Sequence, residues 1–134
     1  MPIPEKIPIR WMPDLHTSHV GYFNGSHQFF LAQHRVAAAG GLAEYLALYC
    51  FDGRGALSSH TIRGPLERVT EESISGLMGR LGEYEFTDIC VAPFEVRFDG
   101  HSFGLVPDAG HSAITLEPGS MITFTEPWDG EYYT

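Results

Sequence analysis

Alternating apolar and polar residues predict β-strands along most of the chain. The clearest alternation runs through Phe94, Val96 and Phe98, with Glu95 and Arg97 between them. This spacing is typical of a strand that buries one face. Residues 44–51 are apolar at nearly every position, which indicates a central strand covered on both faces.

Short turn signals separate these segments and predict that the strands fold back as antiparallel hairpins. The signals are Asn24-Gly25, Asp52-Gly53, Asp99-Gly100 and Pro118-Gly119. Asn-Gly and Asp-Gly tolerate positive φ angles, so Asn24-Gly25 predicts a two-residue type I′ turn. Residues 35–42 contain three alanines and end near two glycines, a composition that fits either a short helix or a loop.

One helix is predicted over residues 70–81. Thr70 is suited to cap its first turn, and Gly82 is suited to end it. The apolar stripe at helical spacing consists of Ile74, Leu77, Met78 and Leu81. Together these elements predict an α+β fold, in which the helix packs on a curved, mostly antiparallel sheet of about eight strands. A small closed β-barrel is the alternative.

The length of 134 residues and the 43% hydrophobic content predict a single domain over residues 1–134. Residues 1–15 are rich in proline and are expected to lie extended over the surface. Cys50 and Cys90 are isolated in apolar surroundings, which favours two buried thiols over a disulfide. With no apolar stretch resembling a membrane helix or a secretory signal, we expect a cytoplasmic protein without membrane association.

Acidic residues outnumber basic ones. Seventeen Asp and Glu face eight Lys and Arg, giving a formal net charge of −9. Nucleic acid is a poor partner for such a surface, because its phosphates attract basic residues. A basic protein partner or a cationic ligand remains compatible with the charge, as does a solvated acidic surface without a partner.

No motif identifies a catalytic site. Gly100-His101-Ser102-Phe103-Gly104 spells the G-x-S-x-G pattern of a hydrolase nucleophile elbow. That elbow requires a strand-to-helix turn, whereas this segment follows a hairpin signal and continues as a strand. We therefore expect no catalytic residue, with hydrolysis through Ser102 or Cys90 as the minor alternative.

Histidines raise the question of a metal. His16 and His19 are separated by two residues, a spacing at which two imidazoles can share a divalent metal ion. A third ligand would have to come from His27, His60 or His101. Scattered surface histidines account for the same pattern, so the sequence predicts no cofactor, with a divalent metal as the alternative.

Residues 116–124 resemble the Pro-Gly turn of cupin barrels, on the letters L-E-P-G-S-M-I-T-F. This resemblance implies a small β-barrel of cupin or calycin type that binds a small molecule or a metal. The H-x-H motif of metal-binding cupins is absent from the chain. A generic Pro-Gly hairpin explains the same residues.

The C-terminal tail combines aromatic and acidic side chains. Its candidate binding residues, taken with a second tryptophan near the N-terminus, are Trp11, Glu126, Trp128, Asp129, Tyr132 and Tyr133. Tryptophan and tyrosine favour interfaces, because they bury large areas and keep a polar group. The alternative is a tail that folds back onto its own domain, against Trp11.

Three segments resemble small uncharacterised bacterial proteins: residues 21–30, 49–53 and 126–132. The resemblance implies a bacterial cytoplasmic domain and transfers no site residue. The function predicted from the residues is that of a non-enzymatic binding module for a protein partner, in the manner of a small acidic immunity or inhibitor protein. The competing hypothesis is the small β-barrel that binds a small molecule or a metal, with or without catalysis.

Overall fold

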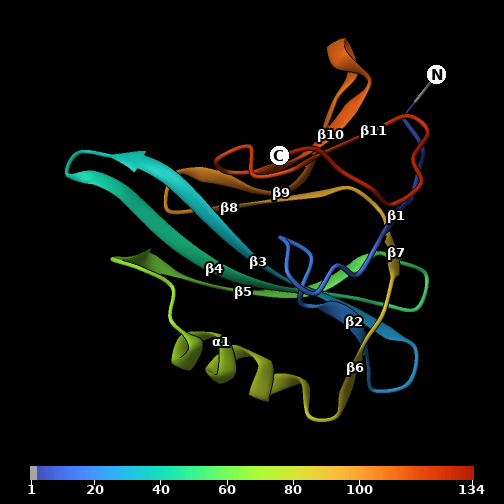
Figure 1. Ribbon diagram of the computed structural model, residues 1–134, viewed down its shortest axis with the longest axis horizontal. Helices are drawn as coiled ribbons and strands as arrows, with labels where there is room; N and C mark the ends of the chain where they lie inside the picture. Colours follow the sequence, from blue (N-terminus) through green and yellow to red (C-terminus); the bar gives the residue numbers. More distant parts are fainter. Residues whose placement is uncertain (1–2) are drawn as a thin grey trace.

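The computed structural model describes residues 3–134 and is built in three layers, a helix, a five-stranded sheet and a four-stranded sheet (Figure 1). The five-stranded sheet has the order β5 (Leu57–Leu66), β4 (Gly41–Phe51), β3 (His27–Ala38), β2 (Val20–Phe23) and β6 (Tyr84–Phe86). The four-stranded sheet has the order β11 (Thr123–Thr125), β10 (Ala113–Glu117), β9 (His101–Asp108) and β8 (Phe94–Phe98). All of these pairings are antiparallel.

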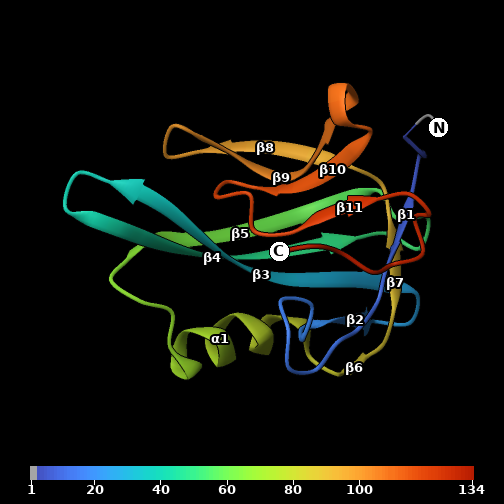
Figure 2. The same cartoon turned by 45° about the horizontal axis from the view of Figure 1, so that its top comes forward.

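The prediction of an antiparallel, strand-rich fold with one main helix is confirmed, but the prediction of a single sheet is wrong. The described residues form three sheets, because β1 (Ile7–Ile9) and β7 (Ile89–Val91) make a separate pair. The barrel alternative is also wrong, since the two larger sheets face each other as open layers (Figure 2). Alternation identifies which face of a strand is buried, and leaves open which sheet the strand joins.

Strand β4 carries both cores of the protein. On one face, Tyr49 and Phe51 pack with Phe103 and Leu105 between the two sheets. On the other face, Leu46, Leu48 and Cys50 pack beneath the helix. The prediction that residues 44–51 form a strand covered on both sides is confirmed.

The helix α1 spans Glu71–Met78 and continues as the short 3-10 helix η1, Gly79–Leu81. Thr70 caps it as predicted: its hydroxyl accepts a hydrogen bond from the amide of Ser73 at 3.1 Å. The hydroxyl of Ser73 accepts one from the amide of Thr70 at 2.9 Å in return. These bonds satisfy two amides that a helix start leaves without partners.

Residues 35–42 belong to two paired strands, apart from the two-residue turn at Ala39 and Gly40. Strands β3 and β4 stay paired as far as Ala38 and Gly41, and the hairpin projects beyond the neighbouring strands (Figures 1 and 2). We call residues 35–44 the arm. Local preferences in this Ala-Gly stretch are weak, so the pairing established by the buried part of the two strands extends into it.

The predicted hairpins form, with one difference in loop length. Asp99 and Gly100 make a two-residue turn with φ angles of 54° and 79°, as required for type I′. The turn at Asn24 is longer, because Phe23 pairs with His27 and leaves three residues in the loop. The two-residue prediction at this position is therefore wrong.

The N-terminal segment contributes to the core. Ile7 and Ile9 in β1 are fully buried, which corrects the expectation that residues 1–15 only cover the surface; Met1 and Pro2 lie outside the described residues. The cysteines are free, as predicted. Cys50 is buried, but Cys90 is exposed, because it alternates with the buried Ile89 and Val91 along β7.

Gly104 illustrates how tightly the four-stranded sheet is paired. It has a φ angle of 147°, and a Cβ atom built on it would lie 2.1 Å from the carbonyl oxygen of Phe94 on β8. A side chain at this position is therefore excluded by both backbone conformation and space.

We expect the substitution Gly104→Ala to lower the free energy of unfolding by about 2–3 kcal/mol, because the methyl group forces β8 and β9 apart. Gly40→Ala is the matched control, since no atom lies within 4 Å of the added Cβ and the φ angle is not in the left-handed range. Chemical denaturation of both variants measures the difference. Equal stabilities would contradict the packing described for Gly104.

Candidate functional site

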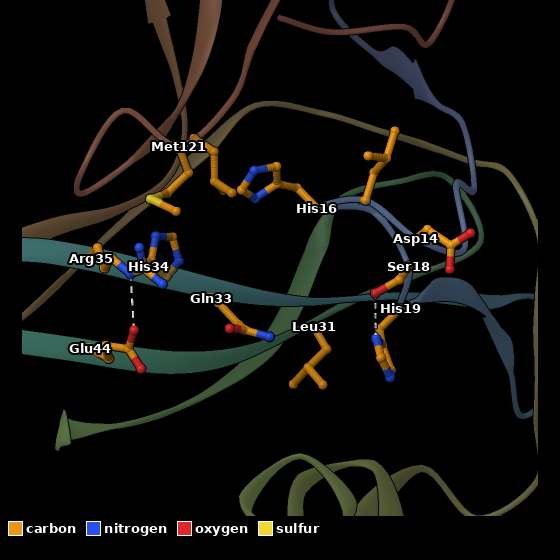
Figure 3. A pocket seen from close by; sticks show the side chains of 12 residues that line it. Asp14, His16, Ser18, His19, Leu31, Gln33, His34, Arg35, Glu44 and Met121 are labelled. Carbon is orange, nitrogen blue, oxygen red and sulfur yellow. Dashed lines mark hydrogen bonds and ion pairs between the residues drawn. The ribbon is translucent and has the colours of Figure 1, made fainter. Parts of the chain in front are cut away.

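An open cavity of about 310 Å³ lies at the edge of β3 (Figure 3). One wall is the loop 14–19, and the opposite wall contains Leu116 and Met121. Gln33 and Arg35 of β3 line the cavity between these walls. Side chains from three separate parts of the chain therefore converge at this edge of the five-stranded sheet.

The cavity exists because β2 is much shorter than β3. The register of the two strands stops at Val20 and Phe30, and one further bond joins the amide of Leu31 to the carbonyl of His19 at 2.9 Å. The chain before His19 then turns away, with the amide of Ser18 bonded to the carbonyl of Leu15 at 3.1 Å. Among the described residues, no strand pairs with this edge of β3 after that point.

The open edge presents backbone groups at alternate residues. In an antiparallel sheet, successive residues direct their N–H and C=O groups to opposite sides of the strand. Leu31 bonds on the β2 side, so Gln33, Arg35 and Ala37 direct their backbone groups to the same side. Every residue of this stretch has a register partner on β4, but only the intervening residues direct their backbone groups toward it. The edge of β3 thus offers outward donors and acceptors at Gln33 and Ala37 beside the cavity. The carbonyl oxygen of Arg35 between them packs against Gly119 in the turn after β10.

A histidine and a tyrosine form a buried pair behind the cavity. His34 is 1% exposed and Tyr49 is fully buried. Nδ1 of His34 lies 3.2 Å from the carbonyl oxygen of Pro118, and Nε2 lies 2.9 Å from the hydroxyl of Tyr49. A carbonyl only accepts, so Nδ1 carries the proton, and Nε2 accepts the hydrogen bond from Tyr49.

Burial keeps both members of this pair uncharged. It lowers the pKa of His34 to about 4, against a smaller opposing effect of the hydrogen bond to Pro118. Burial also raises the pKa of Tyr49 well above its usual range. The imidazole therefore stays neutral near neutral pH. Its two hydrogen bonds, to Pro118 and to Tyr49, hold the turn after β10 against β3.

An ion pair crosses the base of the arm. Nε of Arg35 lies 2.9 Å from Oε2 of Glu44 (Figure 3), and Oε1 of Glu44 accepts a hydrogen bond from the amide of Val69 at 2.6 Å. The Val69 amide is the main cause of the lowered pKa of Glu44, and Arg35 lowers it further. Arg35 and Glu44 therefore neutralise each other locally.

The two histidines predicted to share a metal both line the cavity, but their rings point in different directions (Figure 3). The ring of His16 extends toward Met121, whereas Nδ1 of His19 lies 2.8 Å from the hydroxyl of Ser18. Among residues 3–134, no three His, Cys, Asp or Glu side chains gather closely enough to hold a metal ion. His27, His60 and His101 belong to other strands or turns and do not complete a site.

The predicted binding residues of the tail are largely engaged within the domain. The indole of Trp11 stacks on Phe86 at 5.8 Å between ring centroids. The hydroxyl of Tyr132 lies 3.2 Å from both the amide and the hydroxyl of Thr17. Trp128 packs against the core between the sheets. The contacts of Tyr132 and Trp128 correspond to the alternative of a tail folded back onto its own domain, whereas Trp11, the expected partner of the tail, stacks on Phe86.

The remaining tail residues lie at the surface. Glu126 and Asp129 are exposed, and the carbonyl of Asp129 accepts a hydrogen bond from Nε of Arg10 at 3.0 Å. Tyr133 is 69% exposed and is held by its backbone, which pairs with Thr123. Four of the six predicted residues, Glu126, Asp129, Tyr132 and Tyr133, line a second cavity of about 100 Å³, which shares no lining residue with the cavity at β3.

The G-x-S-x-G pattern belongs to ordinary sheet structure. Gly100 lies in the β8–β9 turn and Ser102 in β9, where the hydroxyl of Ser102 accepts a hydrogen bond from Nη1 of Arg97 at 2.9 Å. The segment lacks the strand-to-helix turn of a nucleophile elbow. This geometry does not support Ser102 as a nucleophile.

The sequence analysis missed the β3 edge and the buried His34. No side-chain motif marks the open edge, because the groups that can form hydrogen bonds there belong to the backbone. His34 did leave a signal, since it continues the alternation of Phe30 and Ala32 on the core face of β3. A histidine at a core-facing position of this alternation is expected to be buried and to need hydrogen-bond partners.

Comparisons with known proteins add no assignment: the chain matches no family model, no curated protein and no solved structure. In the part of the chain that the structure describes, no helix is both long enough and apolar enough to cross a membrane.

The buried state of His34 predicts a loss of stability in mild acid. An unfolded histidine has a pKa of about 6.5, whereas the folded value is about 4. Between these values the unfolded chain binds a proton that the folded chain does not, so unfolding becomes easier as the pH falls. We expect a contribution of about 2 kcal/mol to be lost between about pH 7.5 and pH 5.

The measurement is the free energy of unfolding of the wild type and of His34→Gln across this pH range. The variant cannot titrate at this position and should show the shallower decline. Parallel pH dependences of the two proteins would contradict the buried, neutral state of His34.

Proposed function

We propose that this protein is a non-enzymatic binding module that recognises an extended segment of a protein partner at the edge of β3. The observation that carries the proposal is the set of outward backbone groups at Gln33 and Ala37, with the outward amide of Arg35 between them, which no strand among the described residues covers. The carbonyl of Arg35 packs against Gly119. Extended peptides commonly bind by adding a strand to such an edge.

The surroundings of the edge favour specific recognition over strand pairing alone. The cavity of about 310 Å³ adjoins the same residues and offers space for a side chain of the added strand. Its walls combine apolar groups of Leu31, Leu116 and Met121 with the polar groups of His16 and Gln33. Backbone pairing supplies affinity in this mode, and side-chain pockets supply selectivity.

The charge of the chain favours a basic partner. A net charge of −9 attracts a positively charged protein and accelerates the encounter. This combination of an acidic surface and a binding edge supports an immunity-like or inhibitor-like role. No residue of the proposed site acts as an acid, base or nucleophile in the binding mode described.

We expect a displayed library of random peptides to yield ligands for the wild-type protein. The variant Ala37→Pro should lose these ligands by at least about tenfold, because proline removes an outward amide and obstructs an added strand. The matched control is His60→Pro on β5. Tyr49, the register partner of His60, directs its backbone groups toward β3. The amide of His60 therefore also points outward, but at the other edge of the sheet.

Binding is measured by titration of each enriched peptide against the three proteins, with circular dichroism as a check of folding. A library that yields no ligand would contradict the proposal. The same conclusion would follow from peptides that bind Ala37→Pro as tightly as the wild type.

A further inference from the structure

A second hollow lies on the helix side of the cavity at β3. It is an open groove of about 290 Å³ between α1, the start of β6 and His19. Ile74 and Met78 of α1 and Tyr84 of β6 line it. Gly79 follows α1 directly and contributes no side chain to the groove.

His19 joins this groove to the cavity at β3. Its side chain lines both hollows, and Figure 3 shows that it points toward α1, as does the side chain of Leu31. Leu31 packs in the core beneath α1 and also lines the cavity. The groove and the cavity therefore adjoin at a single side chain.

The groove is uncharged and partly apolar. None of the described residues that line it is Asp, Glu, Lys or Arg, although the chain carries a formal charge of −9. Burial lowers the pKa of His19, so its imidazole stays uncharged at neutral pH. Tyr84 is 43% exposed. A large apolar side chain placed here would cover this ring and gain free energy by leaving water.

A strand added to the edge of β3 has to leave that edge at His19. The amide of Leu31 is already bonded to the carbonyl of His19 at 2.9 Å, so His19 and β2 occupy the edge from Leu31 back to the start of β3. Pairing at Gln33 needs no bond to the carbonyl of Arg35, which packs against Gly119. Because β3 itself leads away from His19, an antiparallel strand reaches His19 with its C-terminal end.

We infer that the partner segment turns at His19 and places a large apolar side chain, C-terminal to its paired stretch, in the groove beside α1. This inference rests on the proposed function, because it extends the ligand of the same edge. The groove adjoins the proposed binding cavity and lacks charged side chains, so it suits an apolar group better than the basic groups that the acidic chain attracts elsewhere. An anchor of this kind adds the sequence selectivity that backbone pairing lacks.

The test uses the peptides that the library yields with the wild-type protein. Gly79→Phe and Ser75→Phe each fill the groove and should weaken binding by at least about tenfold, because burial of one large apolar side chain contributes that much affinity. Gly76→Phe is the matched control, since Gly76 belongs to α1 but does not line the groove. No atom of the described residues lies within 4 Å of a Cβ added at either glycine, so both variants are expected to fold.

The peptides are varied in parallel. The paired stretch is located by N-methylation of successive peptide amides, since each methyl group removes a donor that an added strand needs. Replacing the large apolar residue on its C-terminal side by alanine should weaken binding to the wild type by a similar factor. The same replacement should have little effect in the two groove variants, because the groove is already filled. Circular dichroism checks the folding of each variant.

Groove variants that bind the peptides as tightly as the wild type would overturn the inference. A loss of affinity that follows residues on the N-terminal side of the paired stretch would overturn it as well. If the peptides bind in either case and are lost in Ala37→Pro, the proposed function stands and the second anchor is wrong. A library without any ligand would contradict the proposed function, and this inference with it.

Discussion

The pairing of β3 with β4 is the constraint on which the rest of the structure depends. The two strands are matched at eleven consecutive positions, from Gln28 and Phe51 to Ala38 and Gly41. Their buried portion separates two apolar cores, one beneath the four-stranded sheet and one above α1. Because this register is fixed by side chains on both faces, a slip by one residue would exchange the two cores.

Two polar contacts hold the four-stranded sheet in place over this pair. The hydroxyl of Tyr49 bonds to His34, which also bonds to the carbonyl of Pro118 beyond the end of β10. The hydroxyl of Tyr45 donates to Asp99 in the β8–β9 turn at 2.5 Å. Apolar packing between sheets is not directional, whereas these bonds select one relative position of the layers.

The sequence predicted the parts of the fold that local chemistry decides. The cap at Thr70, the apolar stripe of α1 and the hairpin turn at Asp99-Gly100 depend on neighbouring residues, and these predictions are confirmed. The type I′ turn predicted at Asn24-Gly25 forms at Asp99-Gly100 instead. The division into three sheets depends on which distant strands meet, which period-two patterns do not encode. The arm was missed because alanine and glycine carry little strand preference, and long-range pairing decides their conformation.

The candidate site shows the same limit. The spacing of His16 and His19 allowed a shared metal ion as an alternative to no cofactor, but their rings diverge in a loop without regular helical geometry. The edge of β3 arises from the early end of β2, an event in a different segment of the chain. The site is thus defined by the absence of a neighbouring strand among the described residues. No residue within β3 indicates that absence.

A recognition surface made of backbone amides and carbonyls places few demands on side-chain identity. Apart from proline, any residue at Gln33, Arg35 or Ala37 presents the same groups in the same direction. Such a surface tolerates extensive drift in amino-acid sequence as long as β2 stays short and β3 stays long. Distant relatives that share the binding mode would then be recognised by their relative strand lengths, more readily than by any shared string of residues.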